Sequence, residues 1–142
     1  MRFMILVPAS TQSEAGVLPD AKLLGAMGKF NEEMVKAGVM LAGEGLAPSS
    51  KGARLTFAGG GKATVVDGPF TESKDLIAGF WLIQVRSKEE AVAWVKRAPF
   101  GEGVRLEIRQ VQEMADFAAV DPTGELRANE QKLRETAAAQ KG

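Results

Sequence analysis

Three side chains with catalytic or metal-binding chemistry are missing from this sequence, which contains no histidine, no cysteine and no tyrosine. Their absence excludes imidazole catalysis, thiolate nucleophiles, disulfide bonds, common zinc sites and phenol donors. Any chemistry therefore depends on carboxylates, lysine, arginine, hydroxyls and backbone groups. Because the carboxylates also lack the spacing of a hard-cation loop, we expect neither a metal nor a cofactor.

An excess of charge and a long apolar segment are absent as well. The chain has 18 basic and 18 acidic residues, so no global field favours nucleic acid or anionic lipid. No window approaches the roughly 20 apolar residues that span a bilayer. We therefore expect a cytoplasmic protein that binds neither nucleic acid nor membranes.

The 142 residues, 45% of them hydrophobic, are enough for one compact domain. We expect this domain over residues 1–118. The remaining stretch, 119–142, mixes acidic and basic residues with three consecutive alanines and predicts a solvated helical tail.

Two segments, 2–7 and 76–85, are apolar at both alternate sets of positions, which is typical of central strands covered on both faces. Between the strands, helices are expected from Pro19–Asp20 to Gly38 and from the capping box at Ser87 to the residue before Pro99. Strands 54–58 and 62–67 flank three glycines and predict a hairpin. The order of elements predicts an α+β fold of the ferredoxin-like βαββαβ type, with the hairpin as an insertion.

Right-handed crossovers place both helices on the same face of such a sheet. The other face then carries Met4, Leu6, Phe80 and Leu82 as an uncovered apolar patch, which soluble monomers rarely tolerate. We therefore expect a homodimer that packs sheet against sheet.

The segment from Asp67 to Trp81 reads DGPFTESKDLIAGFW and resembles the signature of the YCII-related proteins of the DGPF type. The resemblance extends over about residues 2–117. Further segments that carry it are Ala42–Leu46, Pro48–Gly52, Glu90–Arg97 and Glu107–Val111. It implies a dimeric α/β-barrel in which two ferredoxin-like sheets close on each other.

The same resemblance implies where a site would lie. In the wider YCII family a His–Asp pair in a cleft is proposed as catalytic, and Asp67 matches its aspartate. Ala47 stands where relatives often carry histidine, so an imidazole mechanism is not available to this chain. Some family members are encoded beside, or fused to, sigma factors of the extracytoplasmic-function class, which implies a regulatory accessory role as the alternative.

The candidate catalytic residue is Asp67. Next to Gly-Pro its carboxylate is expected to accept backbone amides in an Asx-turn. The functional hypothesis is that burial near Phe70 and Trp81 favours its protonated form and makes it a general base. The candidate ligand-binding residues around it are Gly68, Pro69, Phe70, Glu72, Lys74 and Trp81.

Each of these candidates also has a structural interpretation. Gly68 and Pro69 suit a tight bend, Glu72 and Lys74 an exposed ion pair, and Trp81 either the helix-covered core or a cleft. Two functions therefore stay open. One is a small-molecule-binding dimer with weak lyase- or isomerase-type activity through Asp67, and the other is a non-enzymatic accessory protein that binds a partner protein.

Overall fold

The computed structural model describes residues 1–141. The chain forms two compact units, Met1–Gln110 and the segment from Val111 onward. The stretch expected as a helical tail from residue 119 onward lies in the second unit, which also contains the 3-10 helix η3 (Met114–Val120). Because η3 precedes the charged stretch, composition alone does not separate it from the first unit.

The first unit is built on a four-stranded antiparallel sheet with the strand order β2-β5-β1-β6. Its strands are β1 (Arg2–Pro8), β2 (Met40–Gly45), β5 (Ile77–Gln84) and β6 (Glu107–Gln110). The two strands with apolar residues on both faces, β1 and β5, are central as expected, and β6 lies at an edge. The α+β class predicted from the element order is thereby confirmed.

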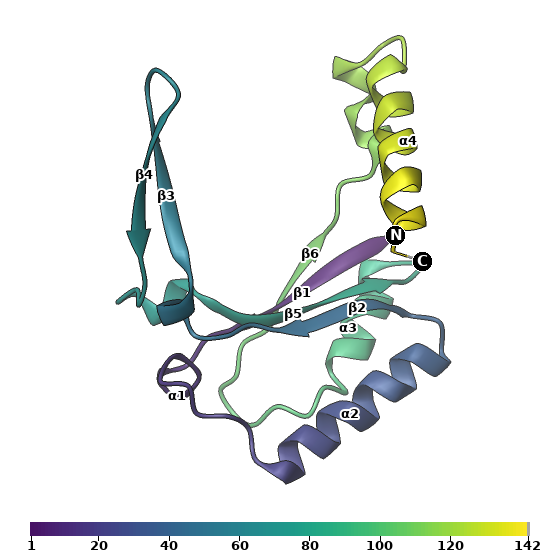
Figure 1. Ribbon diagram of the computed structural model, residues 1–142. Helices are drawn as coiled ribbons and strands as arrows, with labels where there is room; N and C mark the ends of the chain where they lie inside the picture. The colour runs from purple at the N-terminus through teal and green to yellow at the C-terminus, as the bar shows by residue number, and fades with distance from the viewer. Residues whose placement is uncertain (142) are drawn as a thin grey trace. The chain divides into compact units, whose positions relative to one another are not determined.

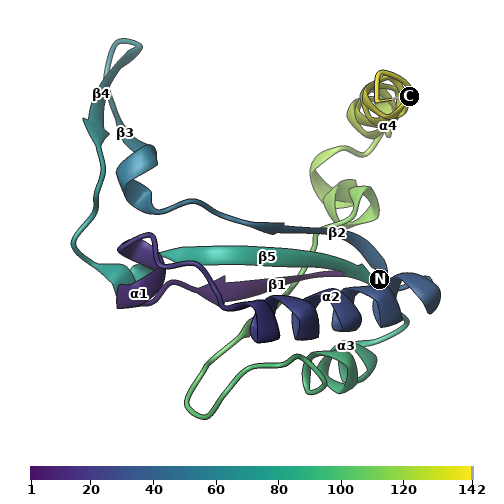
Figure 2. The ribbon, with the colours of Figure 1, turned by 60° about the horizontal axis from the view of Figure 1, so that its bottom comes forward.

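Two helices, α2 (Ala21–Lys36) and α3 (Lys88–Val95), cover one face of this sheet (Figures 1 and 2). The core lies between them and the sheet. Its strand residues are Phe3, Ile5, Trp81 and Ile83, and its other members are Phe30, Met34, Val39, Val85 and Ala91. The strand members are odd-numbered because alternate side chains of a strand point to the same face.

The helix boundaries follow local signals in the sequence. Asp20 caps α2 by accepting a hydrogen bond from the amide of Leu23 at 2.8 Å. Gly38 follows the helix in the left-handed region, with a φ of 71° that favours glycine. Ser87 caps α3 through the amide of Glu90, but the Glu90 carboxylate accepts from the amide of Arg86 and not from that of Ser87.

The face of the sheet opposite the helices carries two cross-strand pairs, Met4 with Leu82 and Leu6 with Phe80. These four side chains are half-buried in the chain. Charged residues flank them on the outer strands: Glu44 lies beside Phe80, Arg109 beside Met4 and Glu107 beside Leu6. The face therefore has an apolar centre and a charged rim.

The predicted hairpin forms a separate two-stranded sheet, β3 (Ala53–Ala58) with β4 (Lys62–Asp67). Every residue of both strands is exposed. Two views of the first unit show that the hairpin extends from the side of the four-stranded sheet opposite α2 and α3 (Figures 1 and 2). The hairpin thus stands on the same side as the apolar centre described above.

Three short helical turns were not expected from the sequence. The stretch 8–19, which is rich in proline, serine and glycine, contains α1 (Thr11–Glu14), and Ser10 and Ser13 form a capping box at its start. The 3-10 turns η1 (Ser49–Lys51) and η2 (Ser73–Asp75) lie on either side of the hairpin. One-turn helices lack the hydrophobic periodicity by which longer helices are recognised.

The second unit combines η3 with α4 (Glu125–Ala139), a helix without buried residues. Asp121 is 4% exposed and accepts hydrogen bonds from the amides of Leu126 and Arg127 and from the Arg127 guanidinium. Burial opposes ionisation of Asp121, but the bonds from Arg127 and Leu126 outweigh it and hold its pKa below the usual range. Across the described part of the chain no helix is long and apolar enough to cross a membrane.

Candidate functional site

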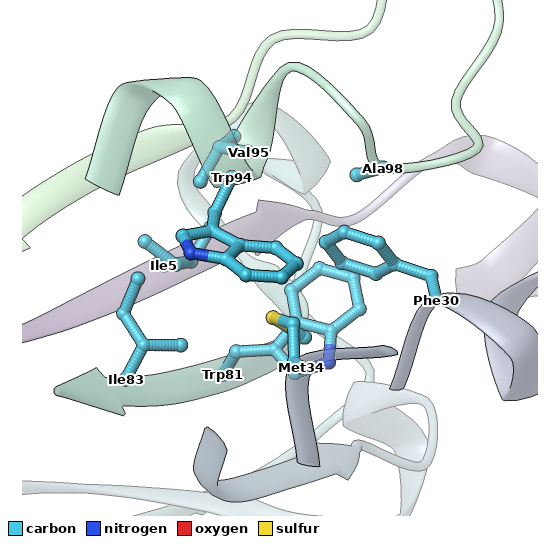
Figure 3. Close-up of a pocket in the computed structure, with 8 residues that line it drawn as sticks. All are labelled: Ile5, Phe30, Met34, Trp81, Ile83, Trp94, Val95 and Ala98. Atoms are coloured by element: carbon cyan, nitrogen blue, oxygen red, sulfur yellow. The ribbon is translucent and has the colours of Figure 1, made fainter. Parts of the chain in front are cut away.

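The space between the sheet and its two helices is not a binding site. A cavity there measures about 10 Å³, room for at most one water molecule. Its lining is Ile5, Phe30, Met34, Trp81, Ile83, Trp94, Val95 and Ala98, all apolar or aromatic (Figure 3). The cavity is therefore a small packing gap in the core.

Trp81 belongs to this core. Its ring meets Phe30 and Phe100 edge-on, with centroids 5.5 and 6.1 Å apart, and its indole nitrogen donates a hydrogen bond to Asn31 Oδ1 at 2.8 Å. Of the two orientations left open by the sequence, the structure has the one that faces the helices. Trp81 lines the core cavity on that face, whereas the hairpin extends from the opposite side of the sheet (Figures 1 and 2).

The loop Asp67–Phe70, hereafter the DGPF loop, begins where β4 ends. Asp67 is the last residue of β4 and pairs with Ala53, and the amide of Gly68 donates to the carbonyl of Gly52 at 3.0 Å. The bond between Gly68 and Pro69 is cis. The loop therefore starts at the base of the hairpin and leads to η2.

A serine and a glutamate from distant parts of the chain fasten this loop. The amide of Phe70 donates to Ser49 Oγ at 3.0 Å, and the Ser49 hydroxyl donates in turn to the Glu14 carboxylate. Glu14 also accepts the amide of Ser49 at 3.0 Å. The Ser49 hydroxyl and amide together hold the pKa of Glu14 below its usual range, so Glu14 is ionised at neutral pH.

Gly68 is required by close approach of two backbone segments. A Cβ built on it would lie 1.8 Å from the carbonyl oxygen of Ser49 and 2.6 Å from its carbon. Since both are backbone atoms, no side-chain adjustment relieves the clash. The bend predicted at Gly68 is thus also a contact with η1 that admits only glycine.

Phe70 is held from a second direction by the hairpin. The Arg54 guanidinium carbon lies 4.0 Å from the centroid of the Phe70 ring, a cation–π contact. Phe70 is half-buried. Its amide is fixed by Ser49 and its ring by Arg54, so the end of the loop has a defined orientation.

Asp67 is exposed, and among the side chains that the structure describes its carboxylate has no hydrogen-bond partner. The Asx-turn expected there is therefore not formed. The burial that the general-base hypothesis needs is likewise not supplied by the single chain. A carboxylate held in place by a fastened loop, with its hydrogen-bonding capacity unused, is chemically available to a ligand.

Glu72 and Lys74 lie beyond the loop and are exposed. Neither forms an ion pair within the part of the chain that is described, so the ion pair suggested by the sequence is not present. The structure thus joins Asp67, Gly68, Pro69 and Phe70 in one fastened loop, with Glu72 and Lys74 next to it in sequence.

Sequence analysis missed Glu14 and Ser49, which fasten the loop. Ser49 lies in the stretch Pro48–Gly52, which carries part of the family resemblance, and Glu14 lies outside every segment singled out in the sequence. The two residues are 35 positions apart. No local pattern connects residues at such a separation, so only the fold reveals the contact.

The second unit contains a groove of about 420 Å³ between η3 and α4. Its lining is Gln112, Met114, Phe117, Val120, Asp121, Leu126, Arg127, Glu130 and Arg134. Both arginines of the groove are paired with carboxylates, Arg127 with Asp121 and Arg134 with Glu130. The groove is therefore apolar with a neutralised rim.

Comparison with solved structures finds similarity to the 5-chloro-2-hydroxyhydroquinone dehydrochlorinase of Burkholderia phenoliruptrix AC1100, in a complex with 2,5-dihydroxybenzoquinone. The two chains are 17% identical, the alignment covers 80% of this chain and 95% of the other, and the TM-score is 0.44. Comparison with curated protein sequences gives no match.

A family model described as the YCII-related domain matches residues 1–115. This match spans the whole four-stranded sheet, its helices, the hairpin and the DGPF loop, and the chain belongs to the YCII-related family.

Proposed function

We propose that the protein is a homodimer that binds a small molecule at the DGPF loop, with Asp67 as the group that exchanges a proton with it. The observation that supports this most is the contrast within the loop. Its backbone and ring are fixed by Ser49 and Arg54, whereas the Asp67 carboxylate is left unbonded among the described groups. Fixed geometry around an available acid–base group is what binding and proton transfer require.

The reaction type follows from the residues at hand. Without histidine, cysteine or tyrosine, a carboxylate is the natural proton acceptor of this chain. In a lyase- or isomerase-type reaction, Asp67 accepts a proton from the substrate and then returns it to the substrate or to solvent. Such a reaction is slow when the carboxylate is exposed, because proton acceptors act best with a pKa near the working pH.

The dimer forms through the open face of the four-stranded sheet. The pairs Met4–Leu82 and Leu6–Phe80 occupy the centre of that face, and the neighbouring Glu44, Glu107 and Arg109 form its rim. An apolar centre inside a polar rim is the usual anatomy of a protein interface. A two-fold axis places the same patch on both partners.

A thermal-shift screen of small metabolites tests this function. Ligands that raise the melting temperature of the wild type should not raise that of Asp67→Ala. A ligand stabilises the folded protein only if the folded protein binds it. The control is Glu102→Ala, which removes an exposed carboxylate outside the loop. If a ligand stabilises both variants equally, its binding site does not include the Asp67 carboxylate.

The second unit favours another function, that of an accessory protein that binds a partner protein. Beside its groove it exposes Phe117, Val120, Leu126 and Leu133, with exposed fractions from 42 to 76%. Apolar side chains gathered at a groove are typical of a docking surface. If this function is correct, a partner co-purified with the wild type should be lost from Val120→Asp and kept by Asp67→Ala.

A further inference from the structure

The hairpin β3–β4 has two chemically different faces. Direct cross-strand pairs share a face, so Leu55 with Val65 and Phe57 with Ala63 form one side. Leu55 is 53% exposed, Phe57 82% and Val65 60%. We call these three residues the arm face. The opposite side carries Arg54, Thr56, Lys62 and Thr64, together with Ala58 and Val66.

This asymmetry distinguishes the arm face from ordinary surface. An isolated two-stranded hairpin is marginally stable in water and needs packing on at least one face. Every residue of both strands is exposed in the chain. The mainly polar side is suited to contact with water. The arm face is apolar like a buried surface, although it is exposed in the single chain.

The position of the hairpin indicates what covers it. The hairpin extends from the same side of the sheet as the patch formed by Met4, Leu6, Phe80 and Leu82 (Figures 1 and 2). A second copy seated on that patch lies beside the hairpin. The hairpin thereby stands next to the dimer surface already inferred from the sheet.

The register also connects the arm face to the candidate site. Residues 63, 65 and 67 alternate along β4 with the same orientation, and Asp67 pairs with Ala53 as Val65 pairs with Leu55. Asp67 therefore lies on the same side of the hairpin as Leu55 and Val65. A molecule that covers the arm face also approaches the Asp67 carboxylate.

We propose that the arm face, Leu55, Phe57 and Val65, docks on a second copy of this chain, and that the second copy supplies the wall of the DGPF site next to Asp67. The proposal rests on the homodimer proposed above. It adds that the site is incomplete in one chain, because the apolar surroundings that a proton-accepting carboxylate needs come from the partner.

Single cysteines test the docking directly, since the natural chain contains none. Phe57→Cys places a thiol on the arm face, and Thr56→Cys places its matched control on the adjacent, oppositely directed residue. Both positions are exposed in the single chain. The measurement is the rate of reaction with 5,5′-dithiobis(2-nitrobenzoic acid) over a range of protein concentrations, with the oligomeric state followed by analytical ultracentrifugation.

In the dimer, the thiol of Phe57→Cys should react about tenfold or more slowly than that of Thr56→Cys, because covered groups react through transient opening. Dilution to the monomer should remove the difference. Leu55→Cys, again compared with Thr56→Cys, repeats the test with a smaller change of volume. As an independent readout, Leu55→Glu should weaken dimerisation about tenfold or more, and Thr56→Glu should leave it unchanged.

The outcomes separate this proposal from the one on which it rests. If the wild type is a monomer at every concentration, both are overturned. A stable dimer in which arm-face and control thiols react equally fast keeps the homodimer and overturns the arm-face contact. Protection that persists after ultracentrifugation shows dissociation to the monomer assigns the cover to the same chain and also overturns the contact.

Discussion

The four-stranded sheet and the hairpin β3–β4 are both antiparallel and both carry an apolar face, yet only the first has a core. Ile5 and Trp81 pair across β1 and β5 and are 1% and 8% exposed. Leu55 and Val65 pair in the same way across the hairpin and are more than half exposed. The difference lies in the helices α2 and α3, which cover one sheet and not the other.

This comparison shows that alternation identifies a face but not what covers it. On the helix-covered side the cover is part of the chain, so burial contributes to the stability of the monomer. On the open side and on the arm face the cover is a second copy in our proposal, so burial contributes to association. The two kinds of apolar surface should therefore respond differently to substitution and to dilution.

The largest effect is expected from neighbouring residues on opposite faces of β5. Ile83→Ala removes a side chain that is 1% exposed and should reduce the free energy of unfolding by about 2–5 kcal/mol at any protein concentration. Leu82→Ala, on the open face, should instead lower the melting temperature mainly at concentrations where the wild type is dimeric. Urea unfolding at two protein concentrations distinguishes the two variants. A loss of stability in Leu82→Ala that does not depend on protein concentration would contradict the dimer.

The next prediction compares a glycine at the base of the hairpin, Gly68, with a glycine at its tip, Gly59. Gly68→Ala forces a Cβ into the Ser49 backbone and should destabilise the protein by about 1–3 kcal/mol as the segments separate. Gly59→Ala is the matched control, because nothing lies within 4 Å of its Cβ position. The melting temperatures of the two variants measure the difference. Equal values would mean that the two segments do not touch in solution.

A smaller effect is expected from Ser49→Ala, which removes the acceptor of the Phe70 amide. The lost bond to the Phe70 amide should contribute about 0.5–1.5 kcal/mol, the usual value for one hydrogen bond, and the bond to the Glu14 carboxylate is lost with it. The effect should be local, with faster hydrogen exchange at Phe70 and unchanged exchange in β1 and β5. Ser50→Ala, at the exposed neighbouring position, provides the reference, and the idea fails if both variants exchange alike.

The smallest effect is a dependence on acid. The pKa of Glu14 in the folded protein is below its ordinary value, because the Ser49 hydroxyl and amide bind its carboxylate, so the ionised form stabilises the fold at neutral pH. This contribution is lost as the pH falls through the folded pKa and Glu14 becomes protonated. The NMR shift of the Phe70 amide should follow that titration in the wild type and not in Glu14→Gln. An identical pH profile in both proteins would remove Glu14 from the loop contact.

Much of the fold was predictable because its signals are local. Apolar residues on both faces of 2–7 and 76–85 predicted the central strands, Asp20 and Gly38 marked the ends of α2, and the three glycines marked the hairpin tip. The same double-sided pattern left the direction of Trp81 open. When both faces of a strand are apolar, alternation no longer says which one meets the helices.

The candidate site was predictable only in part, for a different reason. The DGPF loop itself was found from contiguous residues, but the contacts that fasten it join Glu14, Ser49 and Phe70 from three segments. Long-range contacts of this kind depend on the fold as a whole.

The Ser49 hydroxyl has an evolutionary consequence. The Ser49 hydroxyl donates a hydrogen bond to Glu14 and accepts one from the amide of Phe70. A substitution that removes this hydroxyl therefore breaks both bonds at once. Substitutions at positions 14 and 49 should therefore covary across homologues, whereas the residue at the adjacent position 50 should vary independently of both.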